Sequence, residues 1–339
     1  MNKGLLIYNP EDYEKNKWFV SEMLQKAAAH HLSLTLVLRN HLLLSIDEKE
    51  GPVAFQILDM PITFSNTCRQ ATSHGSSTSE KVMMRDAHSN HDLAPIPTEA
   101  SERLCRYFPL KDTDFVINRT RDSLIGKHFE KMGCRVFNNS DVTEICNHKG
   151  KTHQLINSHG IPSVKTILGN VHYFNPAMLP FSYPVVLKSV SGHGGSEVYL
   201  LKNELELTTH LVNLRTEDFV LQEPCTNPGV DIRVFALGGE IVAAVRRFCP
   251  TDFKSNYSLG GSATAYHLQP HEKQLVEQIL GLLPFDFIGI DFIINQEGDL
   301  LFNEIEDVVG TRTLYLNYPD MDIVDQFLSY IDVALTSTH

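Results

Sequence analysis

Residues 289–306 read GIDFIINQEGDLLFNEIE, a pattern that predicts two short apolar strands joined by a turn. The strands are expected from Ile288 to Ile294 and from Leu300 to Ile305. The turn falls on Gln296-Glu297-Gly298-Asp299, where glycine and acidic residues favour a tight reversal. The sequence therefore predicts a β-hairpin around which the C-terminal half is built.

Three acidic residues lie in this hairpin, and strand geometry predicts that they converge. Side chains alternate between the two faces of a strand, so Glu304 and Glu306 point to the same face. Asp291 on the partner strand can join them. Such oxygen ligands suit Mg²⁺, which substrate phosphates usually complete. The alternative is a solvated acidic hairpin, because acidic strand ends are common on protein surfaces.

Composition indicates a globular protein of two or three domains, because 339 residues exceed what one small core needs. With 29 basic and 41 acidic residues, the net charge of −12 argues against sequence-independent binding to nucleic acid or an anionic membrane. The six cysteines include no CxxC pair, so we expect neither a zinc site nor a disulfide framework. We expect a cytoplasmic protein, without a signal peptide or a membrane span.

The N-terminal half begins with a strand–helix–strand pattern. Gly4 to Tyr8 is an expected strand, Lys15 to His30 a helix and Leu32 to Leu38 a second strand, which together predict a parallel sheet. The first turn has no GxGxxG, so we place no dinucleotide there. Further strands and helices are expected at 114–118, 121–132, 134–138 and 140–146, the last capped by Ser140.

Two features of this half leave alternatives open. Residues 65–101 are polar and predict a long loop or partly disordered insertion, whose His74, His88 and His91 are either a metal cluster or solvated side chains. Arg119 and Arg121 follow an expected strand, where they could bind an anionic substrate or form surface ion pairs.

A second unit begins near Lys149. A helix is expected from Lys151 to His159, and Pro184 to Ser189 is an apolar strand that carries Lys188 near its end. A glycine-rich turn follows at 191–196, which lets backbone N–H groups approach phosphate oxygens. It is not a P-loop, because no GK[ST] follows. Strands are then expected at 219–222, 231–235 and 241–247, and helices at 271–283 and 322–333.

The order of these elements from Lys149 to Leu335 resembles the ATP-grasp carboxylate-amine ligases. It is most similar to the RimK-like branch, the α-glutamate ligases of ribosomal proteins and the ligases of a lysine-biosynthesis carrier protein. The motifs are PVVLKS with its glycine-rich loop, QEP, DIRVF, VAAVRR, KSN with GG, GIDF and FNEIE. The resemblance implies an α/β (α+β) ATP-grasp fold with an N-terminal Rossmann-like domain at 1–146, a lid subdomain at 147–220 and a C-terminal subdomain at 221–339.

The resemblance also implies roles for individual residues. Lys151 and Lys188 would hold the α- and β-phosphates of ATP. Arg233 would contact the γ-phosphate and the activated carboxylate, Lys254 and Asn256 would surround the acyl phosphate, and Arg246 and Arg247 could contribute. The loop over the triphosphate would comprise Ser191, Gly192, His193, Gly194, Gly195 and Ser196. Adenine would meet the linker Gln222, Glu223, Pro224 and Cys225, with Val186 and Phe292 near the ring. Two Mg²⁺ ions would be held by Asp291, Glu304 and Glu306.

Two positions depart from the family's pattern. The family commonly has Asn where this chain has Glu306, and a third carboxylate adds negative charge that could change metal affinity. The segment Thr226-Asn227-Pro228 stands where related ligases often have an acidic residue for the ribose hydroxyls. Ribose contact could therefore come from Asn227 or from elsewhere.

The resemblance implies an ATP-dependent ligase that joins a carboxylate to an amine through an acyl phosphate, with release of ADP and phosphate. Glutamate is the default substrate, and the acceptor could be a small amine, a peptide or a carrier protein. We also expect a homo-oligomer. Two alternatives remain: a phosphotransferase that acts on a hydroxyl group, and a non-catalytic ATP-binding module, for which Glu306 is the only hint.

Overall fold

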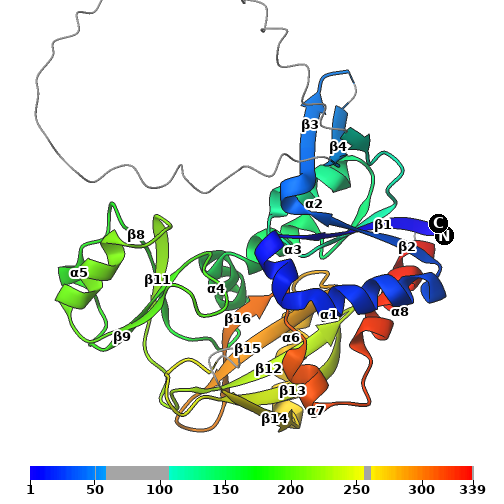
Figure 1. The fold of residues 1–339 in the computed structure, drawn as a ribbon. Coiled ribbons are helices and arrows are strands. Elements are labelled where there is room, and N and C mark those ends of the chain that lie inside the picture. Colours follow the sequence, from blue (N-terminus) through cyan, green and yellow to red (C-terminus); the bar gives the residue numbers. More distant parts are fainter. Residues whose placement is uncertain (50, 59–106, 256–260, 338–339) are drawn as a thin grey trace, which may run out of the picture.

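The computed structural model describes residues 1–49, 51–58, 107–255 and 261–337 of the chain (Figure 1). The expected insertion at 65–101, with its three histidines, lies outside these residues, and so does Asn256. The described strands form four sheets.

The N-terminal sheet has the order β2-β1-β6-β7, and every pairing in it is parallel. The expected strand–helix–strand opening is thus confirmed. From β1 the chain crosses to β2 on one side, whereas the next parallel partner, β6, lies on the other side. This reversal is the kind of switch point at which open α/β sheets bind ligands, outside the carboxyl ends of the strands. The elements are β1 (Asn2–Tyr8), α1 (Pro10–Lys26), β2 (Leu32–Leu38), β6 (Phe115–Asn118) and β7 (Arg135–Phe137).

A small antiparallel sheet and two helices accompany this sheet. The strands are β3 (Leu42–Asp47), β4 (Gly51–Ile57) and β5 (Tyr107–Pro109), and the helices are α2 (Ser123–Lys131) and α3 (Ser140–Cys146). The predicted cap of α3 was wrong by one residue. Asn139 is the cap and accepts from the backbone N–H of Val142 at 2.8 Å, because Ser140 is already helical and its hydroxyl donates to Glu130 at 2.6 Å.

A separate antiparallel sheet lies at one side of the molecule, with the order β10-β9-β11-β8 (Figure 1). One helix covers it, and its apolar core includes Leu187, Leu207 and Phe219. We call this layer the lid sheet. Its elements are β8 (Thr166–Asn170), β9 (Val185–Ser189), β10 (Val198–Leu201), α5 (Glu204–Val212) and β11 (Asp218–Gln222). The helix α4 (Lys149–Ser158) joins it to the remainder and begins two residues before the predicted start at Lys151.

The third region is an antiparallel sheet of order β14-β13-β12-β15-β16, which we call the large sheet. The predicted hairpin is its β15–β16 pair, with Asp291 opposite Glu304. The strands are β12 (Val230–Leu237), β13 (Glu240–Phe248), β14 (Ser262–Tyr266), β15 (Phe287–Ile294) and β16 (Leu300–Glu306). The helices are α6 (Pro270–Leu280), α7 (Arg312–Asn317) and α8 (Ile323–Thr336).

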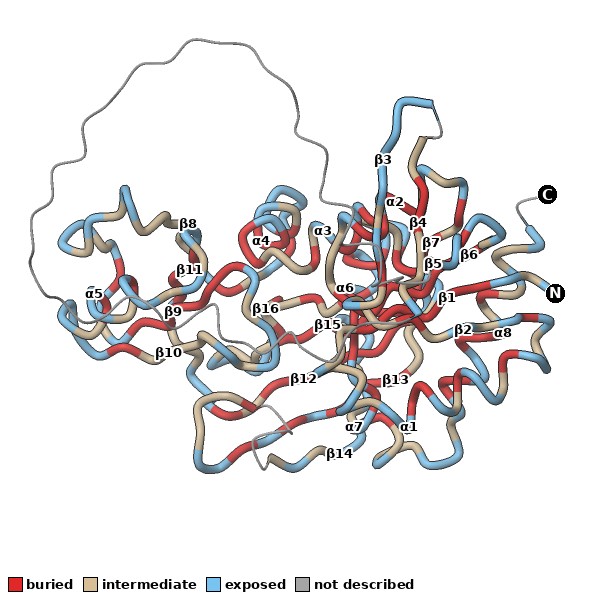
Figure 2. Tube along the Cα trace, turned by 45° about the horizontal axis from the view of Figure 1, so that its top comes forward, coloured by how far each residue is buried: buried red, intermediate tan, exposed pale blue. Residues whose placement is uncertain are grey.

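One apolar core joins the N-terminal sheet to the large sheet. Tyr8, Phe19 and Phe137 from the first region pack in the same cluster as Phe287 and Phe327 from the last. Helices α1 and α8 lie side by side along this junction (Figure 1). Buried residues lie along this junction and in the large sheet, and also in β9 and β11 of the lid sheet (Figure 2). Since the burial of large apolar side chains is the main favourable term in folding, this junction fixes the N-terminal sheet over the large sheet.

Candidate active site

A cavity of about 430 Å³ lies between the lid sheet and the large sheet, and we call it cavity 1. Part of its wall is apolar, with Val164, Pro184, Val186, Leu200 and Ile293 among the lining side chains. The four residues of the expected linker also line it: Gln222, Glu223, Pro224 and Cys225.

The prediction that Phe292 lies near the adenine ring disagrees with this geometry. Phe292 is fully buried in the core of the large sheet, against Phe302, and its neighbour Ile293 faces the cavity. Successive side chains of a strand point to opposite faces, so Ile293 lines the cavity where Phe292 was expected.

Gln222 fixes the end of the linker through a buried hydrogen bond. Its amide nitrogen lies 2.9 Å from Nε2 of His153 and 2.9 Å from the hydroxyl of Thr166. Burial, reinforced by Lys188 and Lys149, lowers the pKa of His153 to about 3. The imidazole is therefore neutral at pH 7, and its Nε2 can accept the amide proton.

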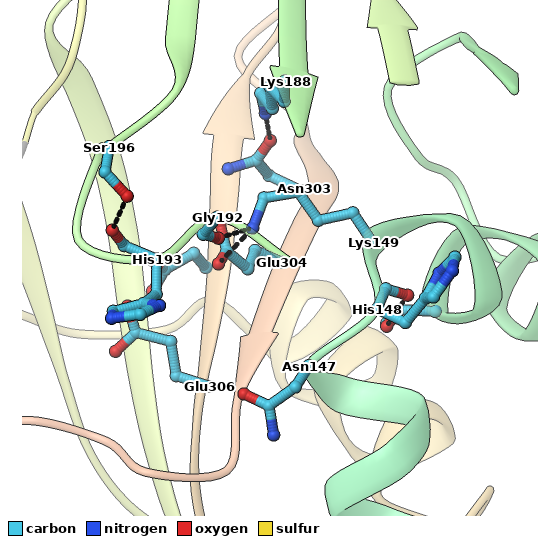
Figure 3. Close-up of polar contacts among 12 residues, drawn as sticks. Asn147, His148, Lys149, Lys188, Gly192, His193, Ser196, Asn303, Glu304 and Glu306 are labelled. Atoms are coloured by element: carbon cyan, nitrogen blue, oxygen red, sulfur yellow. Dashed lines mark hydrogen bonds and ion pairs between the residues drawn. The ribbon is translucent and has the colours of Figure 1, made fainter. Parts of the chain in front are cut away.

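Lys188 lies on β9 with its ammonium group at the cavity wall. Nζ donates to Oδ1 of Asn303 at 2.8 Å (Figure 3). Burial lowers its pKa to about 8, although the nearby Glu304 carboxylate acts in the opposite direction. Among the residues that the structure describes, no carboxylate forms an ion pair with this ammonium group. Its charge is thus only partly compensated at the cavity.

The structure does not bring the predicted phosphate ligand Lys151 into the cavity. Lys151 is exposed and its Nζ lies 2.5 Å from Glu144. Lys149, two residues earlier at the start of α4, lines the cavity instead. Its Nζ donates to the carbonyl of Gly192 at 2.5 Å and to Glu304 at 3.0 Å (Figure 3). Sequence reasoning missed Lys149 because the helix was predicted to begin too late.

The glycine-rich turn covers one end of cavity 1. Gly192, His193, Gly194 and Gly195 line it, whereas Ser196 faces an adjoining cavity and Ser191 lines neither of the two. Gly194 and Gly195 have φ of +62° and +78°, the left-handed region that favours glycine. Lys254 from the large-sheet side donates to the carbonyl of Gly195 at 3.2 Å. The turn is thereby linked to the segment between β13 and β14 of the large sheet.

The three predicted metal ligands all line cavity 1, and each faces a cation. Both oxygens of Asp291 accept hydrogen bonds from Arg233, at 2.7 and 2.6 Å, and Arg247 adds one at 2.7 Å. Glu306 lies 2.8 Å from Arg233, and Glu304 pairs with Lys149. Burial would raise the pKa of Asp291, but the two arginines lower it to about 2. Asp291 is therefore ionised, and its position follows from the cross-strand register with Arg233.

Arg246 and Arg247 are neighbours on β13, but their side chains have different environments. Arg247 is buried and bridges Asp231 and Asp291, whereas Arg246 is exposed, over the ring of Phe248, and lines neither cavity. The hydroxyl of Ser255 also donates to Asp231. Asp231 was absent from the predicted site, although its place beside the predicted Arg233 on the strand pattern DIRVF was visible in the sequence.

Of the three predicted metal ligands, two are suited to a hard cation such as Mg²⁺. Within the described residues, no group of three His, Cys, Asp or Glu side chains is arranged to hold a metal by itself. Glu304 and Glu306 each form one ion pair and line the cavity with side chains 22% and 26% exposed, whereas the Asp291 side chain is 6% exposed and accepts three hydrogen bonds from two arginines. Mg²⁺ commonly takes one or two protein carboxylates and completes its shell with water and phosphate, so the two glutamates suit it.

A larger cavity of about 1270 Å³ adjoins the first, and we call it cavity 2. The two share Lys149, Glu304, Glu306 and the start of the glycine-rich turn. Cavity 2 reaches the carboxyl ends of β1 and β6 and the segment before α7. Eight cationic side chains and four carboxylates line it, although the whole chain is acidic. The cationic residues are Lys15, Arg119, Arg121, Lys149, Arg215, Arg233, Arg247 and Arg312.

Cavity 1 lies between a small antiparallel lid sheet and a larger antiparallel sheet, and a parallel sheet precedes both in the chain. This arrangement is that of an ATP-grasp protein. The fold is shared with D-alanine–D-alanine ligase from Bacillus anthracis complexed with ATP, at a TM-score of 0.63 and 13% identity, over 100% of this chain and 98% of that one. The chain belongs to the RimK-like ATP-grasp family, because a model of the RimK-like ATP-grasp domain matches residues 146–331.

Two curated relatives are similar in sequence over this region. Human N-acetylaspartylglutamate synthase A is 34% identical over 197 residues, which cover 56% of this chain and 50% of the relative. Human beta-citrylglutamate synthase B is 31% identical over 197 residues, with 56% and 51% covered. The chain thus spans about half the length of the curated relatives it matches. No helix in the described part of the chain is both long and apolar enough to cross a membrane.

Proposed function

We propose that the protein is an ATP-dependent ligase that forms an amide bond between a carboxylate and an amine. The observation that carries the proposal is the pair of adjoining cavities, which meet where Lys149, Glu304 and Glu306 lie. Cavity 1 suits a nucleotide, because it has an apolar part beside the 222–225 linker and cations beside the glycine-rich turn. Cavity 2 suits an anionic substrate that meets the γ-phosphate at the shared boundary.

In the proposed reaction the substrate carboxylate attacks the γ-phosphorus, ADP leaves, and an acyl phosphate forms. The amine then attacks the carbonyl carbon and expels phosphate. Phosphoryl transfer depends mainly on positioning and on charge stabilisation, which this chain offers in Lys149, Lys188 and Arg233. Mg²⁺ held by Glu304 and Glu306 would neutralise phosphate charge when bound. Whether Asp291 joins them, and whether there are two ions, stay predictions.

The relatives support glutamate as one substrate. Their names, N-acetylaspartylglutamate synthase and beta-citrylglutamate synthase, denote products that contain glutamate. We extend this to the present chain as the amine substrate. A cytoplasmic location and a homo-oligomer also stay predictions; the buried thiols of Cys134, Cys146 and Cys249, which are free, suit a reducing compartment.

A phosphate-release assay tests the proposal. The full chain is incubated with Mg·ATP, glutamate and a panel of carboxylates, and products are identified by mass. The proposal expects ADP, phosphate and a product whose mass equals the two substrates minus water. ADP with a phosphorylated product and no free phosphate would identify a phosphotransferase. ATP binding without turnover for any pair would favour a non-catalytic module.

A further inference from the structure

The amide of Gln222, at the end of β11, uses its nitrogen inside the protein and leaves its oxygen without a partner. Nε2 donates to Oγ1 of Thr166 at 2.9 Å and lies 2.9 Å from Nε2 of His153. The oxygen Oε1 accepts no hydrogen bond within the described part of the chain, and it is not one of the fully buried unpaired atoms. Because Gln222 lines cavity 1, this oxygen is the part of the amide that faces the cavity.

The two partners of the Gln222 nitrogen can only accept. The hydroxyl of Thr166 already donates to the carbonyl of Val164 at 2.7 Å, so only its lone pairs remain for the amide. The imidazole of His153 is neutral at pH 7, since burial is the main reason that its pKa falls to about 3. A neutral imidazole whose Nε2 accepts a hydrogen bond carries its proton on Nδ1.

The surroundings of His153 hold the ring in this state. The residue is 3% exposed on α4, and its ring packs edge-on against Phe302 with 5.5 Å between the centroids. Nδ1 is buried and has no hydrogen bond of normal geometry among the described residues, although the backbone carbonyl of Asn303 is near enough to raise the pKa of the ring. That carbonyl favours the proton on Nδ1, which leaves Nε2 as the acceptor.

This network prevents rotation of the Gln222 amide. Rotation that exchanges the oxygen and the nitrogen would place Oε1 against the lone pairs of His153 and Thr166. Both hydrogen bonds would be lost in a buried place, where unpaired acceptors are costly. The amide therefore keeps an acceptor, and not a donor, toward cavity 1.

An acceptor at this place distinguishes the two purine bases. Adenine carries an exocyclic amino group, which donates, at the position where guanine carries a carbonyl oxygen, which accepts. Gln222 belongs to the linker beside the apolar part of cavity 1, where a base would lie. Its Oε1 is thus suited to the amino group of adenine and would repel the oxygen of guanine.

We propose that His153 is a positioning residue for base selection: together with Thr166 it holds Oε1 of Gln222 toward cavity 1, where this oxygen accepts a hydrogen bond from the amino group of adenine. The inference rests on the proposed function, because it takes the nucleotide of cavity 1 to be ATP. It goes further in that it assigns the choice of base to a buried histidine that does not itself line either cavity.

The test compares nucleotides that differ only in the purine. Dissociation constants of ATP, GTP and purine riboside triphosphate are measured by calorimetry on the full chain with Mg²⁺ and without other substrates. Purine riboside lacks the amino group, so we expect its triphosphate to bind about 3- to 10-fold more weakly than ATP, and GTP at least about 30-fold more weakly. Equal affinity for ATP and either of the other two would overturn the proposal.

Variants assign this preference to His153. His153→Phe keeps a ring but removes the acceptor, and we expect the preference for ATP over purine riboside triphosphate to fall below about twofold. His153→Gln offers an amide oxygen near the place of Nε2 and should restore the preference. His159→Phe, at the exposed C-terminal cap of the same helix, is the matched control and should keep it. A wild-type preference in folded His153→Phe would overturn the proposal.

Thr166→Val keeps the proposal testable if His153→Phe does not fold. It removes the other acceptor of the network, and we expect the preference for ATP over purine riboside triphosphate to fall at least about twofold. An unchanged preference in this variant would overturn the network.

The two proposals fail in different ways. Absence of ATP binding would overturn both of them. Phosphate release from ATP, with the same preference over purine riboside triphosphate in wild type and His153→Phe, would support the ligase function and overturn this inference. A lower melting temperature of His153→Phe, with an unchanged ratio of the two dissociation constants, would indicate a structural role and also overturn it.

Discussion

Lys149 and Glu304 are 155 residues apart in the chain, yet Nζ of the first donates to Oε1 of the second at 3.0 Å. The pair lies at the boundary of cavities 1 and 2, and the same ammonium group donates to the carbonyl of Gly192. A single lysine therefore links the start of α4, the glycine-rich turn and the end of the large sheet. Lys151, which the sequence favoured as a phosphate ligand, has no such contact and pairs with Glu144 instead.

Substitution of these two lysines gives a matched comparison. We expect Lys149→Ala to weaken ATP binding about 10- to 100-fold, because a buried charge-assisted contact to phosphate is lost. Lys151→Ala should change it less than about twofold, since that side chain is exposed and paired only with Glu144. Titration with an ATP analogue measures both. Equal effects would show that Lys149 is not the main phosphate ligand, and a larger effect at Lys151 would identify Lys151 as the phosphate ligand.

The lowered pKa of Lys188, about 8 in the free protein, predicts a pH-dependent affinity for ATP. The ammonium form carries the charge that phosphate needs, so ATP binding is strongest below pH 8. As pH rises above 8 the free protein loses this proton, and the dissociation constant of ATP should rise by up to about tenfold per pH unit. Lys188→Arg keeps its charge over this range and should show a flat profile. A flat profile in the wild type would contradict the prediction.

Removal of the charge of Glu304 should abolish turnover. We expect Glu304→Gln to lose nearly all phosphate release and to require a higher Mg²⁺ concentration for ATP binding, because an amide is a weaker ligand than a carboxylate. Glu297→Gln in the exposed turn of the same hairpin is the control and should behave as wild type. Melting curves confirm that both variants fold. Wild-type rates in folded Glu304→Gln would remove this residue from the site.

The buried arginine of β13 predicts a large effect on stability. Arg247→Met leaves Asp231 and Asp291 without one of their cations, and we expect a loss of about 3–5 kcal/mol in the free energy of unfolding. Arg246→Met, one residue earlier and exposed, should cost less than about 1 kcal/mol. Urea denaturation measures both values. Similar losses in the two variants would show that Arg247 is not part of a buried charge network.

The glycine-rich turn should become protected when ATP binds. Residues 191–196 contact the segment between β13 and β14 through the hydrogen bond from Lys254 to Gly195, and bound phosphates would add contacts to their backbone N–H groups. We expect slower protease cleavage within this segment on addition of Mg·ATP. Cleavage in the exposed turn of the β15–β16 hairpin, at 296–299, serves as the internal reference. Unchanged cleavage in the turn would contradict the proposed closure over the nucleotide.

Local patterns in the sequence determined much of this protein. Alternation and turn residues predicted the β15–β16 hairpin, which follows from interactions between near neighbours along the chain. The parallel β1–β2 pair joins residues 30 positions apart, and the strand–helix–strand order predicted it. The motif order also indicated the ATP-grasp class. The start of α4 was missed because its cap, the side chain of His148 that accepts from the N–H of Lys151, is not a common capping residue.

Only the tertiary structure decided which charged groups compensate one another. Arg119 and Arg121 look alike in the sequence, yet Asp12 pairs with one of them and none of the described carboxylates pairs with the other. Lys149 and Lys151 also look alike in the sequence, yet Lys149 pairs with Glu304 from a strand more than a hundred residues later, whereas Lys151 pairs with the nearby Glu144. Ion pairs and burial depend on groups that folding brings together from distant segments, and sequence spacing carries no record of that distance.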